Sequence, residues 1–171
     1  MRLFIALDLK ELKSYFNEIQ EQIPRDIAKI KPVSSFHLTL KFLGEIQDSE
    51  EIKSALKNIK FKPLKLKLTK ELGFFPSKSY IKVVWIALKE NKTLMQLQKD
   101  INQALIHIRD DFKFVPHLTL ARVSFIKDRE AFTKAIDNIK LKSKEITIKK
   151  FKIIKSELTS EGPIYEDLGV F

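Results

Sequence analysis

The sequence contains no cysteine, which excludes disulfide bonds, a thiolate nucleophile and any cysteine-based metal site. It also has no apolar run of about 18 residues, the length that a membrane-spanning helix requires. The apolar stretch after Met1 meets an acidic residue at Asp8, too early for a secretory signal. We therefore expect a cytoplasmic protein with no membrane partner.

Glycine and proline are scarce, with 4 and 6 residues among 171, and no linker rich in Gly, Ser or Pro divides the chain. Apolar residues make up 44% of the sequence, which is enough to bury a hydrophobic core. Domains commonly contain about 150 residues. We expect a single domain over residues 1–171 that consists of two small, intimately packed lobes.

Arginine is rare as well: only five of the 32 basic residues are arginine, and the formal net charge is +10. A basic surface attracts nucleic acids and other phosphate-bearing partners. Lysine-rich sequences equally use lysine to solvate helix surfaces. The charge therefore favours a phosphate-bearing partner but does not identify it.

A repeat is the most informative feature that is present. The tetrapeptide His-Leu-Thr-Leu occurs at residues 37–40 and again at 117–120. Without a gap, residues 37–60 align with residues 117–140 at 11 identical positions of 24. A repeat that keeps a histidine and a hydroxyl two residues apart predicts two half-sites brought together by an internal two-fold.

Apolar periodicity predicts the same order of elements, β-α-β-α-β, in each half of the chain. Each half then forms a sheet with helices on one face. The predicted fold is α+β, a bilobal pseudo-two-fold duplication of two antiparallel-rich sheets with helices on the outer faces and a central groove. We expect strands at 2–9, 36–43, 64–68, 80–88, 116–123, 146–158 and 164–171, and helices at 10–23, 49–60, 91–108 and 129–140.

Each motif strand has two chemically different faces, because residues i and i+2 of a strand share a face. His37 and Thr39 point one way and the intervening leucines the other, and His117 and Thr119 repeat this pattern. We expect the leucines in the core and the four polar groups in the groove. Imidazole titrates near pH 6.5, so one histidine can act as a base while the other donates a proton. The threonine hydroxyls can donate to phosphate oxygens where charge builds up.

Arg122 follows His117 by five positions and offers a permanent planar cation suited to phosphate. In an ideal strand it would share a face with Leu118 and Leu120, away from the histidine. It therefore needs a bulge or a twist in the strand to reach the groove.

The motif histidines have two other interpretations, a structural role and a zinc site. A single His-x-Thr on a strand is more often structural, but two copies in a gapless repeat, among only three histidines, favour catalysis. Zinc would need three or four ligands, and no Asp, Glu or Cys lies on the motif strands 36–43 and 116–123 to complete them. We expect no metal and no other cofactor. His107, beside apolar Ile106 and Ile108, is interpreted as structural or exposed.

These motifs resemble the two-histidine (2H) phosphoesterase superfamily, and within it the archaeal and bacterial RNA 2′,3′-cyclic phosphodiesterases, also called 2′-5′ RNA ligases. The resemblance runs from Met1 to Phe171 in the family's order, through HLTLKFLGE, GFFPSKSYIKVVWIAL, PHLTLAR and SELTSEGPIYEDLGVF. It implies a bilobal α+β fold. It also implies metal-free hydrolysis of a 2′,3′-cyclic phosphate at an RNA end, which leaves a 2′-phosphate.

The resemblance assigns roles to individual residues. His37, Thr39, His117 and Thr119 fall on the family's catalytic positions, with His117 as the base and His37 as the acid. Arg122 falls on its phosphate-binding arginine.

In such enzymes an aromatic side chain near the groove can stack on the terminal base. Phe74, Phe75 and Tyr80 are the candidates by position, and core packing is the alternative for each of them.

The predicted partner is an RNA end or a nucleotide that bears a 2′,3′-cyclic phosphate, and the protein is expected to be a monomer. Hydrolysis of 2′-5′-oligonucleotides or of small cyclic nucleotides at the same site is an alternative. Ligation through a 2′-5′ linkage is the reverse reaction. A non-catalytic RNA-binding module is a further alternative, which the paired histidines disfavour because binding alone does not require two titrating groups.

Overall fold

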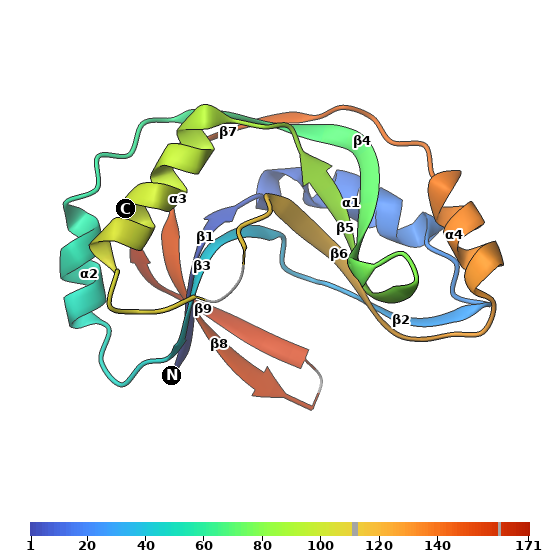
Figure 1. The fold of residues 1–171 in the computed structure, drawn as a ribbon, viewed down its shortest axis with the longest axis horizontal. Coiled ribbons are helices and arrows are strands. Elements are labelled where there is room, and N and C mark those ends of the chain that lie inside the picture. The colour runs from blue at the N-terminus through green and yellow to red at the C-terminus, as the bar shows by residue number, and fades with distance from the viewer. Residues whose placement is uncertain (111–112, 161) are drawn as a thin grey trace.

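The computed structural model describes residues 1–110, 113–160 and 162–171, which form two antiparallel sheets side by side (Figure 1). The four-stranded sheet has the order β3-β1-β8-β9. Its strands are β1 (Arg2–Asp8), β3 (His37–Glu45), β8 (Lys152–Thr159) and β9 (Gly162–Val170).

The five-stranded sheet has the order β2-β6-β5-β4-β7, and all of its pairs are antiparallel. Its strands are β2 (Ala28–Pro32), β4 (Leu64–Ser77), β5 (Tyr80–Leu88), β6 (His117–Ile126) and β7 (Glu145–Ile148).

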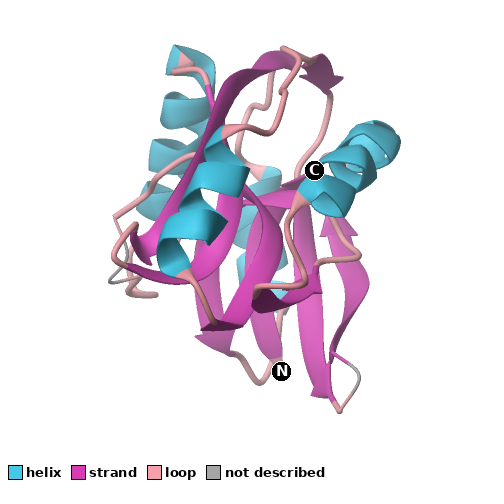
Figure 2. Ribbon diagram, turned by 90° about the vertical axis from the view of Figure 1, so that its right-hand side faces the viewer, coloured by secondary structure: helices cyan, strands magenta, loops and turns pink. Residues whose placement is uncertain are grey.

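Helices cover the outer sides of both sheets, as the fold class predicted (Figures 1 and 2). Helices α2 and α3 lie beside the four-stranded sheet, and α1 and α4 beside the five-stranded one. The helices are α1 (Lys13–Gln22), preceded by the 3-10 turn η1 (Lys10–Leu12), α2 (Glu50–Lys57), α3 (Lys92–Ala104) and α4 (Arg129–Asp137). Among the residues that the structure describes, no helix is long and apolar enough to cross a membrane.

The two lobes exchange elements, so they do not coincide with the two halves of the sequence. Strand β2 from the first half pairs with β6, while β8 from the second half pairs with β1. Helix α1 packs against β6, and α3 packs against β3. Each motif strand is therefore supported by a helix from the other half, which differs from the expectation of one sheet with its own helices per half.

Most predicted elements are present, with three differences in the strands. The strand expected at 146–158 is two strands, β7 and β8, which belong to different sheets and are separated by residues 149–151. The connection expected between Pro24 and Pro32 contains β2, whose five residues are too few to show a periodic pattern. The strand expected at 64–68 continues as β4 to Ser77, because its second part pairs with β5 in a long hairpin. Helices α2, α3 and α4 end three or four residues earlier than predicted, and α1 ends one residue earlier.

The motif leucines lie in the hydrophobic core, as the alternation predicted. Leu38, Leu118 and Leu120 are fully buried, and Leu40 nearly so. A second, small cluster of Phe4, Ala6 and Ile154, with Tyr165 packed against it, covers the opposite face of the four-stranded sheet. This face carries the side chain of His37, because Phe4 and Tyr165 both contact its ring.

Candidate active site

The two motif histidines begin neighbouring strands of different sheets. His37 is the first residue of β3, His117 is the first residue of β6, and these two strands lie against each other. Both side chains are partly buried. The charge of His117 influences the titration of His37, so the structure brings the two imidazoles into one site.

Both motif strands bulge at the last leucine of the motif. On β3, Thr39 pairs with Ala6 and Lys41 with Ile5, so Leu40 is passed over. On β6, Thr119 pairs with Trp85 and Ala121 with Val84, so Leu120 is passed over in the same way. An extra residue in one strand shifts the inward–outward alternation by one position.

The bulge on β6 places Arg122 on the face of the histidine. Leu120 and Ala121 are both fully buried, which moves the next exposed position to Arg122. The guanidinium influences the pKa values of His37 and Tyr165, so it reaches the site from the second sheet. The sequence required a bulge or a twist for this placement, and the structure contains the bulge.

A buried glutamine from the other half holds this bulge. Gln20 on α1 is only 5% exposed, and its Nε2 donates to the carbonyl oxygens of Leu120 (2.7 Å) and Val33 (2.9 Å). The amide of Val33 also donates to the Leu120 carbonyl, at 3.0 Å. In the other lobe, Gln98 on α3 reaches the Leu40 carbonyl at the longer distance of 3.5 Å.

His37 lies in an aromatic pocket with one acid nearby. Its ring centroid is 4.8 Å from that of Phe4 and 5.3 Å from that of Tyr165, and its Nδ1 is 3.5 Å from the hydroxyl of Ser35. Burial lowers the pKa of His37 to about 4. The Asp8 carboxylate opposes this shift, while the positive charges of Arg122 and His117 add to it.

Asp8 is held beside His37 by an ion-pair network. It lies opposite His37 in the register of β1 and β3. Lys152 donates to Asp8 at 2.8 Å and to Asp167 at 2.7 Å. Burial alone would raise the pKa of Asp8, but the hydrogen bonds and charges of Lys152 and Lys10 lower it overall. An ionised carboxylate therefore stands next to one imidazole of the site.

His117 has a defined tautomer. Its Nδ1 lies 2.7 Å from the carbonyl oxygen of Val115, and because a carbonyl can only accept, Nδ1 carries the proton. In the neutral ring Nε2 then has the free lone pair. Burial lowers the pKa of His117, and the hydrogen bond to Val115 opposes the shift.

The hydroxyls of the repeat lie on the same faces as the histidines. Thr39 and Thr119 are partly buried, whereas the leucines on either side of them are buried. The structure therefore brings together His37, Thr39, His117, Thr119 and Arg122, the five residues expected at the reacting phosphate.

Only one of the predicted stacking residues lies beside the histidines. The Phe75 ring is 4.8 Å from His117 and stacks on Trp85 at 4.9 Å. Phe74 packs against the core. Tyr80 lies at the hairpin end of β5, seven residues from the partner of His117, which is roughly 23 Å along an extended strand. Tyr80 instead contacts Lys82 and is 57% exposed.

Sequence reasoning missed several side chains around the site. Trp85 lies 5.8 Å from His117, and a β-carbon at Gly73 would overlap its indole, so glycine is required there. Tyr165 and Asp8 flank His37 from strands far apart in the sequence. The aromatic Trp85 and Tyr165 were visible in the sequence, but only the pairing of the strands shows which ring meets which histidine.

A cavity of about 260 Å³ lies next to these residues, between the two sheets. We call it the basic cavity. It is lined by residues 31–35 and Arg122 on one side, and by Thr159 and residues 162–165 on the other. Tyr165 and Ser35 link it to His37.

No grouping of three or more His, Asp or Glu side chains that could hold a metal occurs within the described ranges 1–110, 113–160 and 162–171. The third histidine, His107, is exposed in the turn after α3, where Glu51 is its acidic neighbour at 3.9 Å.

The chain is similar to a known protein family and to several of its members. The model of the 2′-5′ RNA ligase superfamily matches residues 10–159. A Methanocaldococcus jannaschii protein named RNA 2′,3′-cyclic phosphodiesterase is 37% identical, and the alignment covers 97% of each chain. A Thermotoga maritima protein of the same name is 34% identical, with 98% of this chain and 93% of the relative covered.

Solved structures show the same fold. The protein TT0787 of Thermus thermophilus superposes with a TM-score of 0.78 at 26% identity, covering 100% of this chain and 97% of that one. E. coli LigT complexed with 3′-AMP superposes with a TM-score of 0.69 at 23% identity, covering 99% and 96%.

Proposed function

Because the chain belongs to the 2′-5′ RNA ligase superfamily, we propose that it is an RNA 2′,3′-cyclic phosphodiesterase that opens the cyclic phosphate at an RNA end to a 2′-phosphate. The names of relatives that match over nearly the whole chain support the activity. The observation that carries the proposal is the convergence of two imidazoles and one guanidinium, from two sheets, on one site.

The reaction needs one base and one acid. Water attacks phosphorus and gives a proton to the base, the bond from phosphorus to the 3′ oxygen breaks, and the acid protonates that oxygen. The products are a 2′-phosphate and a free 3′ hydroxyl. In-line attack places base and acid on opposite sides of the phosphate, which suits two histidines from two opposed strands.

His117 is the base. Its Nδ1 proton is engaged by the Val115 carbonyl, so the lone pair of Nε2 is free to accept a proton from water. The hydrogen bond also holds the ring in place, which fixes the direction of that lone pair.

His37 is the acid. In the free protein its pKa of about 4 disfavours the imidazolium, chiefly because the ring is buried. A phosphate anion bound between the two rings raises both pKa values. The Asp8 carboxylate stands next to His37 and directs the proton to this side of the site.

Thr39, Thr119 and Arg122 hold the non-bridging oxygens. Hydroxyl and guanidinium groups donate hydrogen bonds where negative charge accumulates during attack. Arg122 also supplies the positive charge that a metal would supply elsewhere.

The test is hydrolysis of an oligonucleotide that ends in a 2′,3′-cyclic phosphate, in EDTA, with the product mapped by chromatography. A 2′-phosphate product formed at the same rate with and without EDTA is expected. A 3′-phosphate product would contradict the in-line geometry, and a loss of rate in EDTA that zinc restores would contradict the metal-free mechanism.

Ligation is the second candidate activity, favoured by the family model that matches the chain. A 5′ hydroxyl of a second RNA takes the place of water, and the same acid and base act on it. Ligated product should accumulate only at high RNA concentration and should carry a 2′-5′ linkage, and any variant that stops hydrolysis should stop ligation too.

A further inference from the structure

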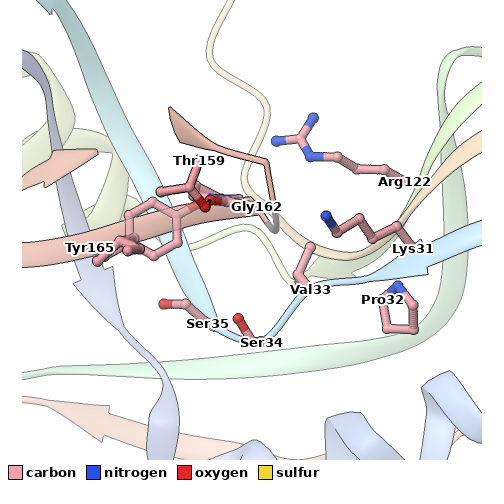
Figure 3. Close-up of a pocket in the computed structure, with 11 residues that line it drawn as sticks. Lys31, Pro32, Val33, Ser34, Ser35, Arg122, Thr159, Gly162 and Tyr165 are labelled. Carbon is pink, nitrogen blue, oxygen red and sulfur yellow. Dashed lines mark hydrogen bonds between the residues drawn. The ribbon is translucent and has the colours of Figure 1, made fainter. Parts of the chain in front are cut away.

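The basic cavity lies beside the proposed catalytic groups, and the mechanism uses only one of its walls. Figure 3 shows Lys31 and Arg122 extending into it from one side, with Tyr165 and Thr159 on the other and Ser34 and Ser35 between them. Only Arg122 takes part in the mechanism above. The rest of the cavity therefore has space and functional groups for another part of a ligand.

The two cations of the cavity are direct neighbours. Lys31 on β2 pairs with Arg122 on β6 in the register of the sheet, so both side chains project from the same face. Arg122 is near enough to His37 to affect its pKa, whereas Lys31 belongs to the outer strand of the sheet. Two neighbouring cations suit two successive phosphates of an RNA chain. Arg122, the cation nearer to His37, then binds the reacting phosphate.

The facing wall suits a ribose or a base. It is formed by the β8–β9 hairpin, which projects from the body of the molecule (Figure 1). Pro163, Ile164 and Tyr165 line the cavity from this hairpin, and Ile164 is 61% exposed. Sites for single-stranded nucleic acid combine such aromatic or apolar surfaces with a cationic groove that follows the backbone.

We propose that the basic cavity binds the nucleotide that precedes the cyclic end, with its phosphodiester at Lys31 and its sugar or base against Ile164 and Tyr165. This rests on the proposed function, because it takes the cyclic phosphate to lie between the two histidines. It names the substrate class more closely: the end of an RNA chain is preferred over a cyclic mononucleotide. A mononucleotide has no such phosphodiester and leaves this part of the cavity to water.

The experiment compares kcat/KM for uridine 2′,3′-cyclic phosphate with that for the dinucleotide UpU carrying the same cyclic end. The wild-type protein should prefer the dinucleotide by about tenfold, the size of one charge-assisted contact. Lys31→Ala should remove most of this preference, acting on the dinucleotide far more than on the mononucleotide. Lys31→Ala should also make the plot of log kcat/KM against log salt concentration shallower for the dinucleotide. The slope should change by about 0.7, which is the contribution of one phosphate on a single strand.

Matched variants separate this site from general attraction by a basic surface. Lys29→Ala removes the same charge two residues away on β2, outside the cavity lining, and should leave the preference unchanged. Ile164→Ala should reduce the preference, whereas Leu158→Ala, on the same hairpin and 66% exposed, should not. All four side chains are exposed, so the variants should fold, and circular dichroism checks this.

The outcomes are distinct. Equal turnover of both substrates by the wild-type protein overturns the cavity proposal and leaves the proposed function standing. Equal effects of Lys29→Ala and Lys31→Ala overturn it in favour of diffuse charge. Turnover of neither substrate overturns the proposed function, and the cavity proposal with it.

Discussion

The side-chain amide of Gln20 donates a 2.7 Å hydrogen bond to the main-chain carbonyl of Leu120, one hundred residues away, at the point where β6 bulges. The bulge decides which face Arg122 occupies. A buried residue of the first helix thus sets the position of a cation in the proposed active site.

Gln20→Met should therefore weaken phosphate binding through Arg122. Methionine keeps the volume but cannot donate to the two carbonyls. The Leu120 carbonyl then keeps only the bond from the amide of Val33, and the loss of one buried hydrogen bond costs about 0.5–1.5 kcal/mol of stability. We expect a lower Tm and a KM raised roughly fivefold, equivalent to about 1 kcal/mol. Gln98→Met is the matched control, because it loses only a 3.5 Å contact to the Leu40 carbonyl. It should change Tm and KM less than Gln20→Met does.

The same prediction has a second test in a double-mutant cycle. If Gln20 acts through Arg122, its substitution should add little to the KM of Arg122→Ala. Full additivity would show that the two residues act independently.

Removal of either imidazole should stop most turnover without unfolding the protein. His37→Ala and His117→Ala should each lower kcat by about 10²–10⁴-fold, the usual contribution of a general acid or base. Both side chains face the site and not the core, so Tm should change little. Near-normal turnover by either variant, measured on a cyclic-ended dinucleotide, would contradict the two-histidine site.

A substrate with sulfur in place of the 3′ oxygen should distinguish acid from base. A thiolate leaves with little protonation, so the thio-substrate should restore turnover to His37→Ala but not to His117→Ala. Rescue of His117→Ala instead would reverse the two roles.

Arg122→Lys should impair binding although it conserves the charge. Lysine loses the planar fork that holds two phosphate oxygens at once. We expect a KM increase of about tenfold, or 1.4 kcal/mol, with a smaller change in kcat. Unaltered kinetics would show that the bulge does not present Arg122 to the phosphate.

The pH dependence follows from the lowered pKa values of both histidines. Below the pKa of His37, about 4, both imidazoles are protonated and no base is present. Above the pKa of His117, which burial lowers from its usual 6.5, both are neutral and no acid is present. Between these values the predominant form has His37 neutral and His117 charged, so the reactive form, with His37 charged and His117 neutral, is a minor species whose amount follows the same bell-shaped curve. The profile of kcat/KM should thus be bell-shaped, with its maximum below pH 6.5.

The profile of kcat should lie at higher pH than that of kcat/KM. It reports the complex with substrate, in which the phosphate anion favours both imidazolium forms. Initial rates over pH 3.5–9 give both curves. A kcat/KM that still rises above pH 7 would contradict the assignment of the titrating groups.

The alternation of polar and apolar residues was sufficient to predict which side chains of the motif strands face the core and which face the site. The alternation of His37, Leu38 and Thr39 is a property of any extended strand, and the structure confirms the buried leucines. The position of Arg122 was not predictable in this way. Its face depends on a bulge that Gln20 and Val33 hold from distant parts of the chain.

The same limit applies to strand β2 and to the stacking residues. Five residues of β2 carry too little periodicity to be recognised, and only their pairing with β6 makes them a strand. Phe75 and Tyr80 are equally aromatic in the sequence. The register of the β4–β5 hairpin places one beside His117 and the other at the hairpin end.

The exchange of elements between the lobes also bears on how the protein is made. Strand β1 leaves the ribosome long before β8, one of its two neighbours in the sheet. Until residues 152–159 have been synthesised, one side of β1 has unpaired backbone groups that can pair with another chain. His37 likewise lacks Tyr165 until then. A nascent chain that stops short of β8 therefore exposes one edge of β1 and lacks the aromatic neighbour of His37.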